Sequence, residues 1–311
     1  MKSAVDPLRN ARIRAAAGDA IARLIHQHGE TVSWRVISEG FIFNGERIRF
    51  ANKTVGIFKP AQLTDGAALS LRTSNPSRPG RARSYADQSI GEGLFHYKLQ
   101  GDDPHNHHNR LLWKAKELGI PLIYFLGIAD ALYVPVYPVR VEAVDSGRME
   151  AVLSAAPVGF GGDASSFVED PAVRRYRTSE VRTRLHQLRF RQQVLAAYGN
   201  RCALSRFPVV RLLDAAHIIR DSDPEGAPVV QNGICLSKLH HTAYDANLLG
   251  IDPAGVVHVR KDLLDAVDGP LLEQGLKNLR GSRMEFPADS RLRPDRGFLE
   301  KRFAEFESET T

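Results

Sequence analysis

Cysteine and long apolar runs are the scarcest features of this 311-residue sequence. Its two cysteines, Cys202 and Cys235, exclude a disulfide scaffold, and we expect a reducing compartment, the cytoplasm. The sequence has no CxxC spacing, which excludes a four-cysteine structural zinc site. No apolar run approaches the roughly 18 residues of a membrane-spanning helix, so we expect no membrane partner. The start of the chain also lacks the apolar core of a secretory signal.

Acidic residues are scarce in one basic segment, although the composition is ordinary. Hydrophobic residues make up 43% and charged residues 25% of the sequence, and the net charge is +6. Residues 174–191 hold seven arginines and only one acid, Glu180. This segment is either a solvated helix face or a surface that binds phosphate, for which the guanidinium fork is well suited. The candidate nucleic-acid-binding residues are Arg182, Arg184, Arg189 and Arg191.

The first half of the chain has the pattern of a strand-rich domain. Apolar residues recur at helical spacing over residues 8–28, and Gly29 marks the expected end of that helix. Short β-rich runs separated by turn signals then follow between residues 33 and 145. A single helix, residues 108–119, interrupts them. We therefore predict a curved sheet or partial barrel, with residues 1–156 as one domain.

The second half is predicted to be a separate α+β domain. Residues 157–173 are rich in glycine, serine, aspartate and proline, which is typical of a linker. The domain then covers residues 174–311. It begins with the arginine-rich helix, continues as a compact α+β block, and contains a late helix at about residues 296–307. The predicted fold class is therefore α+β, with two domains.

Histidines concentrate in the α+β block. His217 lies in the apolar run "RLLDAAHII", and "NGICLSKLHHTAYDANLLGI" is predicted to be a helix that begins at Asn232-Gly233. On such a helix His241 and Asp245 are four residues apart, so their side chains share one face and can bind one divalent ion. Taken alone, such a pair is more often a surface hydrogen bond than a metal site. His240 points to another side of the helix.

The wider spacing of these residues resembles that of the HNH nucleases. His217, Asn232, His241 and Asp245 stand at intervals of 15, 9 and 4 residues. The sequence from "CALSR" at Cys202 through "DAAHII" and "NGICLSKLHHTAYDANLLGI" is similar to the branch of that family with the pattern AAHII, NG, LS and H…D. The resemblance implies a ββα-metal unit, a β-hairpin followed by a helix, that cleaves DNA with one divalent cation.

The resemblance also implies a role for each residue of the pattern. His217 is the expected general base that activates water, because a histidine pKa lies near working pH. Asn232 is expected to hold His217 and its loop by side-chain hydrogen bonds. His241 and Asp245 are the expected metal ligands, and the cation stabilises charge on the phosphate.

Two positions depart from the family pattern. Many HNH nucleases have a metal ligand immediately before the base, but Ala216 occupies that position here and cannot ligate. Asp214 is an alternative ligand, with water as the other way to complete the site. A mixed histidine and carboxylate site is compatible with Mg, Mn, Ni or Zn. Many relatives also carry a four-cysteine zinc, whereas Cys202 and Cys235 are expected to be small buried side chains.

The front domain is expected to select the target, because so small a nuclease module rarely does so alone. Its pattern is loosely similar to SRA/PUA-like modules, some of which flip a modified cytosine into an aromatic pocket. Tyr85, Asp87 and Tyr97 are the candidate pocket residues, and the alternative is that Tyr97 is an aromatic of the strand core. The histidine-rich segment 101–110 is either a second metal site or a solvated loop.

These observations favour an endonuclease of the modification-dependent restriction type, acting on double-stranded DNA that carries modified cytosine. A homodimer is expected, because one HNH site cuts one strand. Two alternatives remain from the sequence. In one, the chain is a DNA-binding regulator with an inactive HNH unit. In the other, the front domain senses a small ligand that activates the nuclease.

Overall fold

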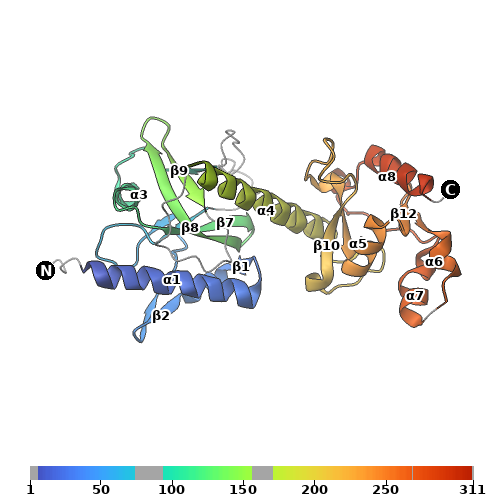
Figure 1. Cartoon of the computed structure of the whole chain (residues 1–311), viewed down its shortest axis with the longest axis horizontal. Helices are drawn as coiled ribbons and strands as arrows, with labels where there is room; N and C mark the ends of the chain where they lie inside the picture. The colour runs from blue at the N-terminus through green and yellow to red at the C-terminus, as the bar shows by residue number, and fades with distance from the viewer. Residues whose placement is uncertain (1–5, 74–93, 156–170, 268, 310–311) are drawn as a thin grey trace. The chain divides into compact units, whose positions relative to one another are not determined.

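The computed structural model describes residues 6–73, 94–155, 171–267 and 269–309, with only the backbone of residues 171–182. Its contacts divide the chain into two compact units, Met1–Leu185 and His186–Thr311. Each unit is α+β and is described by itself (Figure 1). The predicted fold class is confirmed: a strand-rich half-barrel comes first and an α+β region follows.

A seven-stranded sheet forms the centre of the first unit. Its strand order is β4-β5-β7-β8-β9-β6, and β1 pairs with β8. The pairs are antiparallel except for β5 with β7, which is parallel. The strands of this sheet are β1 (Val32–Ser33), β4 (Ile57–Phe58), β5 (Ser70–Arg72), β6 (Phe95–Lys98), β7 (Leu122–Ala129), β8 (Leu132–Asp145) and β9 (Glu150–Ala155). A separate hairpin is formed by β2 (Phe41–Phe43) and β3 (Glu46–Ile48).

Helix α1 (Pro7–His28) packs on β1, β2 and β8, and its bounds confirm the predicted helix (Figure 1). Asp6 caps its N-terminus by accepting from the amide of Arg9. Gly29 ends it with a φ of 82°, a backbone conformation that glycine adopts without steric cost. The two other helices of this sheet region are α2 (Trp34–Glu39) and α3 (His107–Glu117).

The histidine-rich segment before α3 is a hydrogen-bonded loop. Asn106 caps α3 by accepting from the amide of Asn109, and Asp103 accepts from the amide of His105. The ring of His105 stacks on Trp113 at 5.3 Å. Within the described part of the chain no group of three or more potential ligands could hold a metal ion. These contacts support the loop interpretation of the segment.

Helix α4 (Pro171–Ala197) contains the arginine-rich segment. It begins at Pro171, inside the segment expected to be a linker, and proline is well suited to the first turn of a helix because it has no amide hydrogen to leave unpaired. The remainder of the expected linker, 157–170, lies outside the described residues. No described helix is both long enough and apolar enough to cross a membrane.

The second unit is built around an antiparallel hairpin. It consists of β10 (Leu213–His217) and β11 (Gly233–Ser237), with His217 paired to Gly233. The C-terminal part of α4 packs against it at Gly233, where an added Cβ would lie 2.4 Å from Val194. The remaining elements are α5 (Lys238–Asp245), β12 (Leu249–Ile251), β13 (Val257–Val259), α6 (Lys261–Asp265), α7 (Pro270–Gly275) and α8 (Arg296–Ser308).

The structure corrects one predicted helix boundary. Residues 233–237 form β11, whereas a helix was expected to begin at Asn232-Gly233. Ile234, Cys235 and Leu236 are all buried, so the strand is covered on both faces and shows no alternation of polar and apolar residues. A short run of this kind has the same pattern as a buried helix. The helix begins only after Ser237, which accepts from the amide of His240.

Candidate active site

His217 stands at the end of β10 in a half-buried position. Its ring stacks on Phe190 of α4, with the ring centroids 4.1 Å apart and the planes 19° apart. Among the described residues, none makes a hydrogen bond to the buried Nε2 of His217. Burial disfavours the charged imidazolium and therefore lowers the pKa of His217. A neutral imidazole with a free nitrogen is what a general base requires.

Asn232 precedes β11 and is fully buried. Its side-chain oxygen accepts from the amide of Ile219 at 2.8 Å, and its side-chain nitrogen donates to the carbonyls of Ile219 and Ala227 at 3.0 and 3.1 Å. These bonds hold the chain that follows His217, as the resemblance implies for the loop. They go to backbone groups rather than to the imidazole of His217.

His241 lies between two carboxylates. On α5 its Nε2 is 3.2 Å from Oδ2 of Asp245, and its Nδ1 is 3.6 Å from Oδ2 of Asp214 on β10. The hydrogen bond to Asp245 is the largest of the effects that raise the pKa of His241. The hairpin and α5 thus bring together three side chains that are up to 31 residues apart in sequence, which is the separation of Asp214 from Asp245.

The donor chemistry of these side chains fits a divalent cation. One imidazole and two carboxylates supply the mixed nitrogen and oxygen ligands that Mg, Mn, Ni and Zn accept. The two carboxylates face opposite nitrogens of His241, so the three side chains do not converge on one point, and the described chain contains no three-ligand group. Ala216 is buried and offers no ligand atom. His241 and Asp245, one helical turn apart, stay the predicted ligand pair.

The sequence profile of the HNH endonuclease family matches residues 202–252, which contain β10, β11, α5 and β12. The chain contains an HNH endonuclease domain. The predicted ββα arrangement of hairpin and helix is confirmed within this domain. His217, Asn232, His241 and Asp245 all lie inside the matched segment.

Two solved structures are similar to this chain at low scores. One, described as a modification dependent TagI restriction endonuclease, is 14% identical with a TM-score of 0.30, over 91% of this chain and 90% of that chain. The other is the Type IV phosphorothioation-dependent restriction endonuclease ScoMcrA, 14% identical with a TM-score of 0.23, over 96% of this chain and 64% of that chain. No curated protein matches the sequence. Likeness at these scores assigns no substrate to this chain.

A buried Cys202–His240 contact in the HNH domain was not predicted. Nδ1 of His240 is 3.2 Å from Sγ of Cys202, and its Nε2 is 2.9 Å from the carbonyl oxygen of Gly275. Burial alone would raise the pKa of the Cys202 thiol, but hydrogen bonds from His240 and Ser205 lower it to about 6. Both cysteines are buried and free, as predicted. His240 thus links the first turn of the domain to α7 and is not available to a cation.

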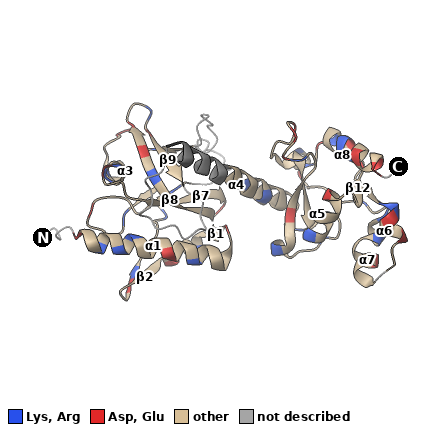
Figure 2. Cartoon of the chain, viewed as in Figure 1, with Lys and Arg blue, Asp and Glu red and all other residues tan. Residues whose placement is uncertain are grey.

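The described part of α4 carries basic residues (Figure 2), and the four candidate arginines differ in their surroundings. The side chain of Arg182 lies outside the described residues. Arg184 is exposed and forms an ion pair with Glu30, and Arg189 is half-buried. Arg191 is turned toward the hairpin, where it donates to the carbonyls of Val210 and Leu213 at 3.2 and 2.7 Å. DNA binding by these arginines stays a prediction.

The candidate base-pocket residues are only partly described. Tyr85 and Asp87 lie outside the described residues. Tyr97, on β6, is 4% exposed and packs edge-on against Tyr124, with the ring centroids 6.1 Å apart. Burial raises the pKa of its hydroxyl. These are the surroundings of a strand-core aromatic, the alternative that the sequence left open.

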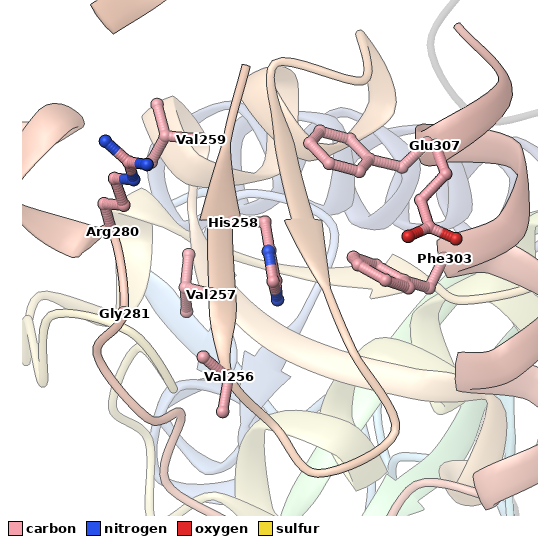
Figure 3. Close-up of a pocket in the computed structure, with 9 residues that line it drawn as sticks. Val256, Val257, His258, Val259, Arg280, Gly281, Phe303 and Glu307 are labelled. Carbon is pink, nitrogen blue, oxygen red and sulfur yellow. The ribbon is translucent and has the colours of Figure 1, made fainter. Parts of the chain in front are cut away.

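A shallow cavity of about 560 Å³ lies elsewhere in the second unit, between β13 and α8 (Figure 3). His258 of β13 faces Phe303 of α8, with their ring centroids 4.8 Å apart. Nε2 of His258 is 3.4 Å from a carboxylate oxygen of Asp252. Arg280 and Glu307 also line the cavity. None of the predicted catalytic residues contributes to it, so it is separate from the candidate active site.

Proposed function

We propose that this protein is a metal-dependent endonuclease that hydrolyses phosphodiester bonds of double-stranded DNA. The observation that carries the proposal is the geometry around His217 and His241 inside the HNH domain. His217 has a buried nitrogen that receives no described hydrogen bond, and β10, the strand that ends in His217, also brings Asp214 to within 3.6 Å of His241. One group suited to proton abstraction and one suited to cation binding thus belong to a single hairpin-helix unit.

The chain's own residues divide the reaction between them. The imidazole of His217 is the proposed acceptor of a proton from the attacking water, and Phe190 holds the orientation of the ring by stacking on it. Asn232 keeps the segment after His217 in place through its three hydrogen bonds. His241 and Asp245 would hold the cation, and a bound cation would neutralise charge on the phosphate and on the leaving oxygen.

The pH dependence of cleavage follows from the surroundings of His217. Only the neutral imidazole accepts a proton, so the rate is expected to fall as the pH drops through the pKa of His217. Burial lowers that pKa below its ordinary value of 6.5. At saturating cation, the acid limb of the single-turnover rate is therefore expected below pH 6.5. A limb centred above pH 6.5 would contradict His217 as the base.

We further propose that the strand-rich first unit reads modified cytosine, as an SRA/PUA-like module would. Support comes from the loose sequence similarity and from the division of the chain into two compact units, with the HNH domain confined to the second. Because the proposed proton acceptor and cation ligands all belong to the second unit, selection of the target DNA can be the role of the first unit.

A cleavage assay on matched duplexes tests both proposals. The duplexes contain cytosine, 5-methylcytosine or 5-hydroxymethylcytosine, and each is incubated with Mg, Mn, Ni or Zn, with a chelator as the control. We expect cutting only of modified duplexes, and none with the chelator. Equal cutting of all three duplexes would support the endonuclease activity and contradict the proposal that the first unit reads modified cytosine. No cutting with any cation, but retention of DNA, would favour a DNA-binding regulator, and cutting only with an added small ligand would favour an activated effector.

We also propose a homodimer, since one HNH site cuts one strand and a double-strand break needs two sites. Sedimentation of the protein with and without a modified duplex gives the mass of the complex. A dimer on DNA, together with linear plasmid as the main product, is the expected result. A monomer that produces only nicked plasmid would contradict it.

A further inference from the structure

Arg191, Asp214 and His241 form a continuous chain of charged contacts in the second unit. Nε of Arg191 is 3.6 Å from Oδ1 of Asp214, and Oδ2 of the same carboxylate is 3.6 Å from Nδ1 of His241. The side chains of the three residues are between 25% and 29% exposed, so water screens these contacts only in part. The chain connects α4, β10 and α5, and it ends at the residue expected to bind the cation.

The two sides of the His241 ring have different partners. Asp245 follows His241 by one helical turn, and its carboxylate lies at Nε2, whereas Asp214 lies at Nδ1. A histidine that binds a metal through one nitrogen usually donates the proton on its other nitrogen to a carboxylate or carbonyl, which fixes both tautomer and ring orientation. Nε2, with Asp245, is therefore the expected ligand side of the ring, and Nδ1 faces the Asp214 carboxylate at an ion-pair distance of 3.6 Å.

Arg191 is held in a way that suits a fixed support. Its guanidinium donates to the carbonyl oxygens of Val210, in the short 3-10 turn before β10, and of Leu213, the first residue of β10. These two bonds place its Nε toward Asp214. The guanidinium therefore lies on the side of the Asp214 carboxylate opposite His241, with Nε facing Oδ1 while Oδ2 faces Nδ1.

We propose that Asp214 is a positioning residue for His241 rather than a metal ligand, and that Arg191 holds Asp214 in this role. The proposal rests on the cation site of the proposed function. It assigns Arg191 to the active site instead of to DNA phosphate. It also gives a role to the carboxylate two residues before Ala216 on β10, which would orient the histidine ligand.

The test measures the affinity for Mn²⁺ by electron paramagnetic resonance, without DNA, in the full-length protein. The variants are Arg191→Met, Asp214→Ala and the double variant. The control is Arg206→Met, which removes an exposed arginine paired with Glu285 at 2.8 Å. Loss of a partner that orients a metal ligand typically weakens binding about 10- to 100-fold. We expect a loss of this order for Asp214→Ala, a smaller loss for Arg191→Met and none for the control.

The double variant separates positioning from a structural effect. If Arg191 acts through Asp214, Arg191→Met causes no further loss of Mn²⁺ affinity in the Asp214→Ala background. Losses that multiply would instead show that Arg191 acts through the carbonyls of Val210 and Leu213, and unchanged affinity in Arg191→Met would also overturn the proposal. Hydrogen exchange across the hairpin and α5 checks that each variant is folded.

The number of water molecules on bound Mn²⁺ separates a positioning residue from a ligand. Water proton relaxation is expected to give the same number in Asp214→Ala as in the wild type, and one more water in the variant would make Asp214 a ligand. A wild-type protein that binds no Mn²⁺ overturns both this inference and the proposed cation site. If the protein binds Mn²⁺ but cuts no DNA, the proposed nuclease activity is wrong. The Mn²⁺ affinities of the variants would still decide the role of Arg191.

Discussion

His217→Ala is expected to lower the single-turnover rate of DNA cleavage by about 10²- to 10⁴-fold, the range that a positioned general base contributes. The reason is the state of its imidazole. Burial lowers the pKa of His217, so the ring is neutral at working pH, and its Nε2 receives no hydrogen bond from any described residue. The affinity for Mn²⁺ should remain close to that of the wild type, since His241 and Asp245 are unchanged.

A second variant separates loss of the base from loss of packing. His217 stacks on Phe190, so alanine removes a ring contact as well as a nitrogen. His217→Phe keeps an aromatic ring against Phe190 and removes only the proton acceptor, so it should fold normally and be as inactive as the alanine variant. His258→Ala, in the separate cavity, is the matched control and should cut DNA at the wild-type rate. Cleavage at the wild-type rate in His217→Phe would contradict the role of His217 as the general base.

Asn232→Ala is expected to destabilise the second unit by about 3 kcal/mol, because buried backbone groups left without a partner cost roughly 1–3 kcal/mol each. The variant loses the bonds to the amide and carbonyl of Ile219 and to the carbonyl of Ala227, and no water can easily replace them at a fully buried position. Cleavage should also decrease, since the segment that follows His217 loses the side-chain hydrogen bonds of Asn232.

Hydrogen exchange is the suitable measurement for this variant. Both tryptophans, Trp34 and Trp113, lie in the first unit, so tryptophan fluorescence does not report on the second. Peptides that cover the hairpin and α5 should exchange faster in Asn232→Ala, whereas peptides of the first unit should not change. Asn278→Ala, at an exposed position of the second unit, is the matched control and should change stability by less than about 0.5 kcal/mol. Equal protection in Asn232→Ala and the wild type would contradict the assigned role of Asn232.

Prediction from sequence succeeded where the signal is local. The apolar spacing and terminal glycine of residues 8–28 predicted α1 within one residue of its bounds, and residues 296–307 predicted α8 equally well. Prediction failed at residues 233–237, because a strand buried on both faces has no period to distinguish it from a buried helix. One face of β11 is covered partly by α4, a helix that is distant from β11 in the sequence.

The sequence by itself determined the HNH domain, which the family profile matches over residues 202–252. Residue type and spacing were also enough to predict a base, an amide, an imidazole and a carboxylate within that segment as its reactive groups. Only the tertiary structure decided which groups these side chains contact. Arg191 belongs to a basic helix that the sequence relates to phosphate, yet it turns toward Asp214, and His240 contacts Cys202 from 38 residues away. Such pairings depend on how helices and strands pack, which no local pattern encodes.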